Sequence, residues 1–353
     1  MKKIILTGGG TAGHVTPNIA LIPALKESGF EIVYIGSKNG MEKELIKPLQ
    51  IEYYGISTGK LRRYLSKENI KDAFRVVSGV SGAFSLIKKI KPDIVFSKGG
   101  FVGVPVVIGA KLCRVPVIVH ESDITMGLAN RLAAPFSDIV LTTFPETANS
   151  VKGGKGICSG TPIRRELFSG DRRRGLSFCG FKGDKPVIMM MGGSQGAARI
   201  NSALRAALPN ILEGFDLVHI CGKGKLDTSI EKEGYRQFEY VTEGLKDIFA
   251  AADIIISRAG SNSIAEFLAL KKPNLLIPLS LSASRGDQIL NAESFKNQGF
   301  SMVLNEEEMT PETLFESIRQ LYLNRDKYIM NMEKNPYSDA IGIIMSIIWK
   351  YIK

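Results

Sequence analysis

Histidine and cysteine are scarce in this chain of 353 residues, which contains three histidines and four cysteines. The histidines, at positions 14, 120 and 219, lie far apart, and none forms the helix-spaced pair typical of a zinc site. The cysteines form no C-x-x-C pair, and the apolar run at the N-terminus is too short for a signal peptide. We therefore expect free thiols in a reducing cytosol and no structural metal.

Long hydrophobic runs are also missing. No stretch approaches about 18 uninterrupted apolar residues, so we expect no transmembrane helix. Hydrophobic residues make up 44% of the chain and charged residues 23%, which is typical of globular proteins. A chain of this length is expected to form about two domains.

Positive charge is concentrated in the first half of the chain. Residues 1–160 carry 21 basic and 12 acidic side chains, a net charge of +9, whereas the remainder has a net charge of +2. This asymmetry predicts an acidic partner: nucleic acid, an anionic membrane or a phosphorylated substrate. Nucleic acid is disfavoured, because glycine loops dominate the motifs and the chain has a single tryptophan.

Short β-branched runs alternate with helical patterns along the whole chain, which predicts an α/β fold with parallel sheets covered on both faces. The expected strands cover 3–6, 31–35, 93–96, 117–120 and 138–141, and then 186–191, 217–220, 254–257 and 274–278. The main expected helices cover 18–28, 69–91, 197–208, 261–270 and 288–298.

A glycine-rich turn follows the first strand of each half, at 7–13 and at 191–197. The alternation of strands and helices therefore begins again in the second half, and two similar domains are expected. The Gly and Pro of segment 160–164 mark the junction, which gives domains 1–162 and 163–337. The polar tract 169–186 is expected to be a surface loop. The sequence does not place the last helix, over 338–353; a return to the N-terminal domain is one option.

Gly8, Gly10 and Gly13 match the G-x-G-x-x-G pattern after a strand, where backbone N–H groups can approach a pyrophosphate. NAD binding also needs an acidic residue at the end of the second strand, and Gly36 and Ser37 occupy that place. No Lys-Ser/Thr pair follows, so a Walker A loop is excluded. A tight turn without a ligand stays open as an alternative.

A further glycine loop covers 97–105 and should emerge at the same edge of the sheet. With Lys98 it predicts a phosphate-binding crevice, and close helix packing is the alternative. His14 follows Gly13 in the first turn of a predicted helix, whose positive end would keep the imidazole neutral. His14 is therefore a candidate general base, although a structural histidine stays equally open.

In the second half, segment 258–266 follows a predicted strand. Gly260 permits a turn and Ser261 could cap the next helix, on which Glu266 lies one turn beyond Asn262. A carboxylate at Glu266 could accept both hydroxyls of a ribose; a solvated helix acid is the alternative. Segment 287–291 opens another helix, whose polar groups could meet a sugar or could simply cap it.

Seven motifs occur in the order found in the MurG family of peptidoglycan N-acetylglucosaminyltransferases, which the chain resembles from about residue 1 to about residue 300. They cover 9–17, 98–103, 120–121, 160–164, 192–197, 258–266 and 287–291. The resemblance implies the GT-B fold, two Rossmann-like domains facing across a cleft. It implies transfer of GlcNAc from UDP-GlcNAc to the C4 hydroxyl of the MurNAc of lipid I, with inversion, giving lipid II and UDP.

The resemblance also implies that no metal or other cofactor is needed. It carries roles onto matching positions: Glu266 for the ribose, Leu245 for the uracil and Gln288 for the GlcNAc. Arg164, Gly193 and Ser194 would contact the nucleotide sugar, and Ser261, Asn262 and Ser263 would lie near the diphosphate. On the acceptor side, Thr11, Ala12 and Gly13 would border the donor sugar, His14 would be the base and Asn130 would support it.

Two departures from the family pattern lie on the acceptor side. The family often has His-Glu-Gln-Asn where this chain has His120-Glu-Ser-Asp123, so the Asp123 carboxylate competes with His14 as the base. The family's Gly-Gly-Tyr is here Gly99-Gly-Phe101, which lacks the hydroxyl. The donor assignments are unaffected.

Segment 62–91 combines apolar with basic residues, which is typical of an interfacial helix. We expect peripheral association with the anionic cytoplasmic face of the cell membrane, and contacts with other cell-wall synthesis proteins stay possible. The alternative is that the apolar stripe packs on the sheet while the lysines face solvent. For the activity, another acceptor or a UDP-GlcNAc 2-epimerase reaction stays open.

Overall fold

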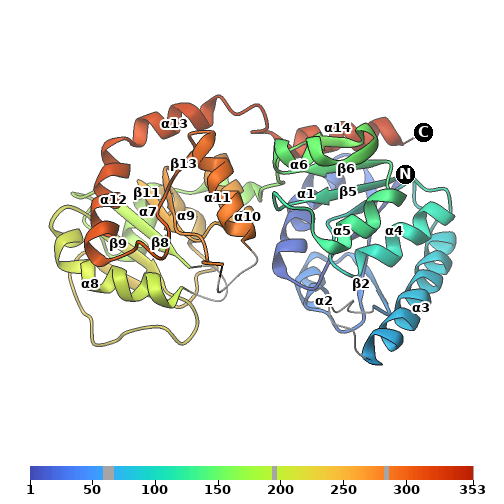
Figure 1. Cartoon of the computed structure of the whole chain (residues 1–353), viewed down its shortest axis with the longest axis horizontal. Coiled ribbons are helices and arrows are strands. Elements are labelled where there is room, and N and C mark those ends of the chain that lie inside the picture. Colours follow the sequence, from blue (N-terminus) through green and yellow to red (C-terminus); the bar gives the residue numbers. More distant parts are fainter. Residues whose placement is uncertain (59–66, 193–196, 282–285, 353) are drawn as a thin grey trace. The chain divides into compact units, whose positions relative to one another are not determined.

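A computed structural model describes residues 1–58, 67–192, 197–281 and 286–352, with side chains in the second range from residue 76 onward. The chain forms two compact units (Figure 1). Unit 1 comprises Met1–Arg164 together with Asp339–Lys353, and unit 2 comprises Arg165–Ser338. Each unit has its own parallel sheet and its own core, which confirms the expected α/β class.

The sheet of unit 1 has seven parallel strands in the order β3-β2-β1-β4-β5-β6-β7. The central strands are short runs of β-branched residues buried on both faces, as covered parallel sheets require. Their bounds are β1 Lys2–Thr7, β2 Phe30–Ser37, β3 Glu52–Ile56, β4 Ile94–Ser97, β5 Val117–Glu121, β6 Ile139–Thr142 and β7 Gly156–Cys158.

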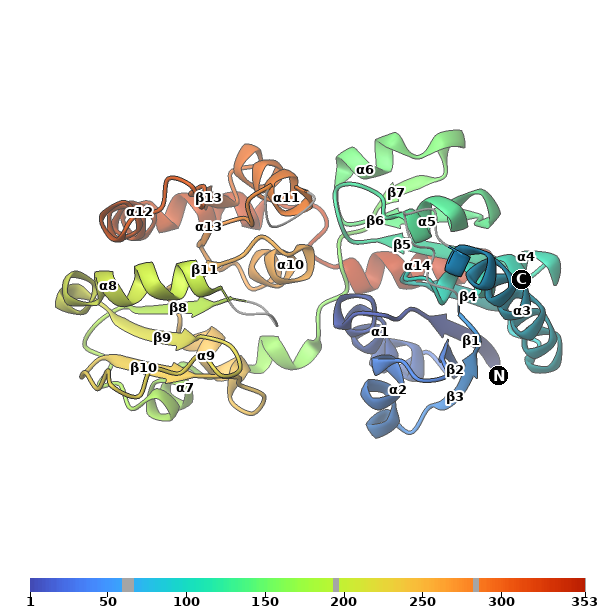
Figure 2. The ribbon, with the colours of Figure 1, turned by 60° about the horizontal axis from the view of Figure 1, so that its bottom comes forward.

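Two helical layers cover this sheet (Figure 2). Their α-helices are α1 Thr16–Glu27, α2 Met41–Ile46, α3 Lys67–Ile90, α4 Gly103–Leu112, α5 Leu128–Ala133, α6 Pro145–Ser150 and α14 Ala340–Tyr351. Short 3-10 helices are η1 Ala12–His14, η2 Lys47–Leu49, η3 Ala134–Phe136 and η4 Lys152–Gly154.

Alternation along β1 divides the core of unit 1. Ile4 points into one cluster, which includes residues of α1 and α14, whereas Ile5 points into the other, which includes residues of α3 and α4. The C-terminal helix α14 belongs to the first cluster through Ile344 and Ile348. The Trp349 ring lies 5.0 Å from that of Phe30 between centroids, so the end of the chain packs on unit 1.

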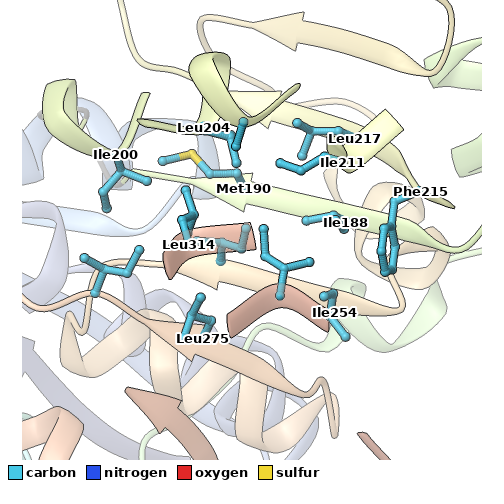
Figure 3. Close-up of a cluster of buried hydrophobic side chains, with 14 of the residues drawn as sticks. Ile188, Met190, Ile200, Leu204, Ile211, Phe215, Leu217, Ile254, Leu275 and Leu314 are labelled. Carbon is cyan, nitrogen blue, oxygen red and sulfur yellow. The ribbon is translucent and has the colours of Figure 1, made fainter. Parts of the chain in front are cut away.

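The sheet of unit 2 has six parallel strands in the order β10-β9-β8-β11-β12-β13. Figure 3 shows its core, in which Ile188 and Met190 of β8 meet Leu204 and Ile211 of α8 and Leu314 of α12. The strands are β8 Val187–Met191, β9 Asp216–Ile220, β10 Tyr235–Phe238, β11 Ile254–Ser257, β12 Asn274–Leu276 and β13 Ser301–Val303. The helices are η5 Arg165–Ser169, α7 Arg172–Cys179, α8 Ala198–Gly214, α9 Leu245–Ala251, α10 Ser261–Ala269, α11 Asp287–Asn297, α12 Pro311–Leu323 and α13 Arg325–Glu333.

The expected loop at 169–186 is wrong, because α7 lies within it. The Asp171 side chain caps this helix by accepting the Arg174 N–H at 2.8 Å, and Gly180 ends it with a φ of 72°. The Arg172 guanidinium donates to the Asp253 carboxylate and to the Ala251 carbonyl, which fixes α7 against the end of α9 within unit 2. Tertiary contacts therefore decide the structure of a stretch whose composition favours a loop.

Candidate functional site

Three loops of unit 1 leave the carboxyl ends of β1, β4 and β5, which meet at one edge of the parallel sheet. The Lys98 N–H donates to the Thr7 carbonyl at 2.8 Å. Gly100 has a φ of 77°, and a side chain there would collide with the Gly9 carbonyl oxygen. The first two glycine loops therefore touch, as the motif spacing predicts.

His14 lies at the end of η1, immediately before α1, rather than within the first turn of a long helix. Its Nδ1 lies 3.1 Å from the Gly9 carbonyl oxygen and 3.1 Å from Thr11 Oγ1. Because a carbonyl only accepts, Nδ1 carries the proton and the lone pair lies on Nε2. The half-buried ring therefore has the tautomer that a base acting through Nε2 requires.

The pKa of His14 lies below its ordinary value. Burial is the main cause, and the positive charge of Lys98 adds to it, whereas Glu121, the Gly9 carbonyl and Asp123 oppose the shift. The sequence predicted the direction correctly but attributed it to a helix end. The cause is burial beside a cation at the neighbouring loop.

The sequence-based placement of Lys98 in a phosphate-binding crevice is wrong. Its side chain is 1% exposed, and Nζ lies 2.6 Å from His120 Nδ1 and in contact with Ser122 Oγ. His120 Nε2 lies 2.8 Å from the Gly160 carbonyl oxygen and so donates to it. His120 Nδ1 is then the acceptor, and the Lys98 amine is turned into the protein.

Glu121 organises the loop after β5. Its buried carboxylate accepts from the N–H groups of Ser122 at 2.8 Å, Asp123 at 3.0 Å and Gly127 at 2.9 Å. It also accepts from Asn130 Nδ2 at 2.9 Å. Asn130 is 4% exposed, and its hydrogen bond to Glu121 helps to hold this loop. Asp123 is half-buried and close enough to His14 to influence its charge.

Sequence reasoning missed Glu42 in α2, which lies behind the first glycine loop. Its fully buried carboxylate accepts from the Gly10 N–H at 3.3 Å, the Ser37 N–H at 2.8 Å and the Ser37 hydroxyl at 2.5 Å. A Cβ at Gly9 would lie 2.5 Å from the Glu42 carboxyl carbon, and one at Gly36 would lie 2.9 Å from its Cγ. The Glu42 carboxylate thus accepts the Gly10 N–H, a group that would point at a phosphate in a dinucleotide-binding loop.

In unit 2, α10 begins directly after the loop that follows the central strand β11. Gly260 is the N-cap residue and Ser261 is the first residue of the helix, so the expected capping role of Ser261 is wrong. Ser261 is buried, and the side chains of Asn262 and Glu266 are half-buried on this helix, as is Ser263. The first turn of α10 thus lies at the carboxyl edge of the sheet, where the helix dipole is positive.

Arg258 ties together the loops after three strands. Its buried guanidinium donates to the Ile277 carbonyl at 3.2 Å and the Pro278 carbonyl at 3.3 Å, and it pairs with Glu306 at 2.5 Å. Asn291 Nδ2 of α11 donates to the Ala259 carbonyl at 3.2 Å. The sequence marked the two motifs but not the contacts of Arg258, because Ile277, Pro278 and Glu306 lie outside both motifs.

The remaining donor-side residues lie on several elements. Leu245 opens α9 and is half-buried, and Gln288, in the first turn of α11, accepts from the Leu279 N–H at 3.1 Å. Gly193 and Ser194 lie outside the described residues. Arg164 is the last residue before unit 2 begins. In the part of the chain that the structure describes, no group of three or more His, Cys, Asp or Glu residues could hold a metal.

The apolar stripe of α3 packs on the core only in part: Ile87 is buried, Leu86 is partly buried against the same cluster, and Val76, Val80 and Phe84 are half-buried. Ala83, Ile87 and Ile90 are buried in the core, whereas Val77 is 67% exposed. The side chains of Lys71, Phe74 and Arg75, like Arg62 and Arg63, lie outside the described residues. None of the helices in the described ranges combines the length and apolar character needed to cross a bilayer.

Comparison with known proteins agrees with this architecture. Residues 4–142 match the glycosyltransferase family 28 N-terminal domain, and residues 187–343 match the C-terminal domain of the same family. The chain is 58% identical to the UDP-N-acetylglucosamine–N-acetylmuramyl-(pentapeptide) pyrophosphoryl-undecaprenol N-acetylglucosamine transferase of Lachnospira eligens over 349 residues, 99% of each chain.

Solved structures with low sequence identity share the fold. The crystal structure of Acinetobacter baumannii MurG has a TM-score of 0.79 at 22% identity, covering 99% of this chain and 100% of that one. A Listeria monocytogenes structure described as a UDP-N-acetylglucosamine 2-epimerase has a TM-score of 0.72 at 14% identity, covering 100% and 97%. The fold alone therefore does not separate transfer from epimerisation. The family domains and the full-length identity do: the chain belongs to glycosyltransferase family 28 and, within it, to the MurG family of N-acetylglucosamine transferases.

Proposed function

We propose that the chain transfers GlcNAc from UDP-GlcNAc to the C4 hydroxyl of the MurNAc of lipid I, with inversion, giving lipid II and UDP. The observation that carries this proposal is the 58% identity, over essentially the full length, to a relative named for that transfer. The epimerase alternative has only a likeness of fold at 14% identity. The reaction would serve peptidoglycan synthesis, and through it cell shape and cell division.

In this proposal unit 2 binds the donor. The first turn of α10, with Ser261 and Asn262, offers backbone N–H groups and a positive helix end to the diphosphate, stabilising the charge that develops as UDP leaves. Glu266, one turn further, accepts the ribose hydroxyls, while Leu245 contacts uracil and Gln288 contacts GlcNAc. Arg164, Gly193, Ser194 and Ser263 complete the nucleotide-sugar contacts. We propose that the chemistry needs neither a bound metal nor another cofactor.

Unit 1 supplies the base in this proposal. The acceptor oxygen attacks the anomeric carbon, the bond from that carbon to the diphosphate breaks with its electron pair leaving on UDP, and the hydroxyl proton passes to His14 Nε2. The hydrogen bond from Nδ1 to the Gly9 carbonyl supports this assignment, because it leaves Nε2 with the lone pair. Asp123, which lies on the neighbouring loop, is the alternative base.

The other acceptor-side roles are proposals as well. Thr11, Ala12 and Gly13, which precede His14 in the glycine loop, border the donor sugar. Asn130 supports the site by holding Glu121, whose carboxylate fixes the loop that carries Asp123. A change at Asn130 should therefore act through the position of that loop.

We further propose peripheral binding to the anionic cytoplasmic face of the cell membrane through the ends of α3 and α4. The two helices run side by side in one direction, since Gly79 adjoins Pro105 and Gly109 adjoins Ala83. Leu112 is 61% exposed there. Five exposed basic residues lie in or directly after the last turns of the two helices and are called the basic rim: Lys88, Lys89, Lys91, Lys111 and Arg114. Such a surface favours reversible binding to anionic lipid.

The test of the proposed reaction is UDP release from UDP-GlcNAc by the purified chain, with and without a lipid I analogue and in the presence of EDTA. We expect release only when the analogue is present, at an undiminished rate in EDTA. Formation of the C2 epimer of the sugar nucleotide without the analogue, and without net release of UDP, would support the epimerase alternative. Loss of transfer in EDTA and its recovery on adding Mg²⁺ would overturn only the metal-free part.

A further inference from the structure

Lys98 is a fully buried lysine at the end of β4, and the direct side-chain contacts of its Nζ are with uncharged groups. Nζ donates to His120 Nδ1 at 2.6 Å and to Ser122 Oγ. A buried ammonium normally needs a carboxylate in direct contact, because leaving water is costly for a charge. The chain thus buries a basic amine among the acceptor-side loops, where it is shielded from solvent.

The stem of Lys98 packs against the loop that carries His14. A Cβ at Gly8 would lie 3.2 Å from the Lys98 Cβ and 2.6 Å from the His14 carbonyl oxygen, and the Lys98 N–H bonds to Thr7. Burial lowers the pKa of Lys98 to about 7, against the opposing charges of Glu121 and Asp123. The charged ammonium is therefore the main form of Lys98 below about pH 7, which includes the acidic side of the range in which an ordinary histidine gains its proton.

We infer that Lys98 is a positioning residue for the reaction: its ammonium fixes the Ser122–Asp123 segment and, by its charge, keeps the His14 imidazole free to accept a proton. The inference rests on the proposed role of His14 as the base. Lys98 opposes protonation of His14 from the β4 loop, whereas Glu121 and Asp123 favour it from the β5 loop. Two further titratable groups adjoin these loops: His120, held neutral by burial and by Lys98, which lower its pKa, and Glu42, bonded to Gly10.

The test is a titration of the His14 ring by NMR in the wild type and in Lys98→Met, without substrate. Met keeps most of the apolar length of the side chain and removes the charge. We expect the pKa of His14 to rise, because removing a nearby positive charge favours the protonated imidazole. Only three histidines have to be resolved. An unchanged His14 titration in folded Lys98→Met would overturn the inference.

Two controls separate the charge from general loosening of the loop. Lys26→Met removes the same charge from the exposed far end of α1, ~15 Å along the helix from its start, and should leave the His14 titration unchanged. Ser122→Ala removes one contact but keeps the ammonium, and should also leave it unchanged. A shift in Ser122→Ala as large as that in Lys98→Met would overturn the role of the charge.

Kinetics add a second readout. With the lipid I analogue, the acid limb of kcat/KM in Lys98→Met should move to higher pH by the same amount as the His14 titration, while KM for UDP-GlcNAc stays unchanged. If the wild type shows a depressed His14 pKa but no transfer, the proposed function fails and the electrostatic inference stands. If Lys98→Met does not fold, a wild-type His14 that titrates at or above 6.5 overturns the inference by itself.

Discussion

Replacing Glu42 with alanine should destabilise unit 1 strongly, although the residue lies outside every motif. The carboxylate accepts three hydrogen bonds, two from Ser37 and one from the Gly10 N–H, in a fully buried site. Hydrogen bonds to a charged group contribute about 1.5–3 kcal/mol each. The variant also removes the cost of burying the charge, so we expect a net loss of about 3 kcal/mol in the free energy of unfolding.

Trp349 makes this measurement specific to unit 1. It is the single tryptophan of the chain, and it packs on Phe30 in the core of that unit. Urea unfolding followed by tryptophan fluorescence therefore reports unit 1 even if the two units unfold separately. Glu44→Ala is the matched control, because Glu44 is exposed on the same helix, and its effect should stay within about 0.5 kcal/mol. Equal stabilities of the Glu42 and Glu44 variants would refute the reasoning.

The same site has a predictable pH dependence. Burial by itself raises the pKa of Glu42, but the hydrogen bonds from Ser37 and Gly10 outweigh it and leave the pKa below its ordinary value. The folded state therefore binds the proton less readily than the unfolded state, whose pKa is about 4.3. The stability difference between wild type and Glu42→Ala should be complete at pH 7 and should shrink as the pH falls below about 4.

Three further predictions concern binding and catalysis. Glu266→Ala should weaken binding of UDP-GlcNAc at least tenfold in calorimetry while its circular dichroism stays unchanged, because a hydrogen bond from a ribose hydroxyl to a carboxylate is worth more than about 1.4 kcal/mol; unchanged affinity would remove Glu266 from the site. His14→Ala should lower kcat at least a hundredfold with little change in KM for the donor; if turnover survives and Asp123→Asn abolishes it, Asp123 is the base. Replacing Lys88, Lys89 and Lys111 of the basic rim with glutamine should weaken binding to anionic vesicles about a hundredfold. The same changes at the exposed lysines 223, 225 and 334 of unit 2 should have little effect. Equal binding of both variants would exclude the basic rim as the membrane-binding surface.

The central strands and the loops after them could be predicted because one strong pattern specifies both. A buried parallel strand appears in the sequence as a short apolar run, and a glycine turn at its end marks the carboxyl edge of the sheet, where ligands bind. The four edge strands β3, β7, β10 and β13 were not predicted. An edge strand packs against one neighbour only, so polar residues and glycine are tolerated in it, as in β3 with Glu52 and Gly55.

The contacts that set the chemistry of the site were less accessible to sequence reasoning. Lys98 stands in a glycine loop, where a phosphate-binding lysine is expected, but its side chain points inward and its Nζ contacts His120 of β5. Glu42 reaches Gly10 across 32 positions in sequence, and Arg258 reaches Glu306 across 48. Such pairs depend on which loops meet at the sheet edge, and a pattern confined to one loop does not contain that information.

The most direct test of the proposed reaction is the mass spectrum of a lipid I analogue after incubation with UDP-GlcNAc and the purified chain. Inverting transfer predicts a product heavier by one N-acetylhexosamine residue, with a β linkage to the C4 oxygen of MurNAc in its NMR spectrum. An unmodified analogue, recovered while UDP-GlcNAc is bound or epimerised, would contradict the proposed transfer.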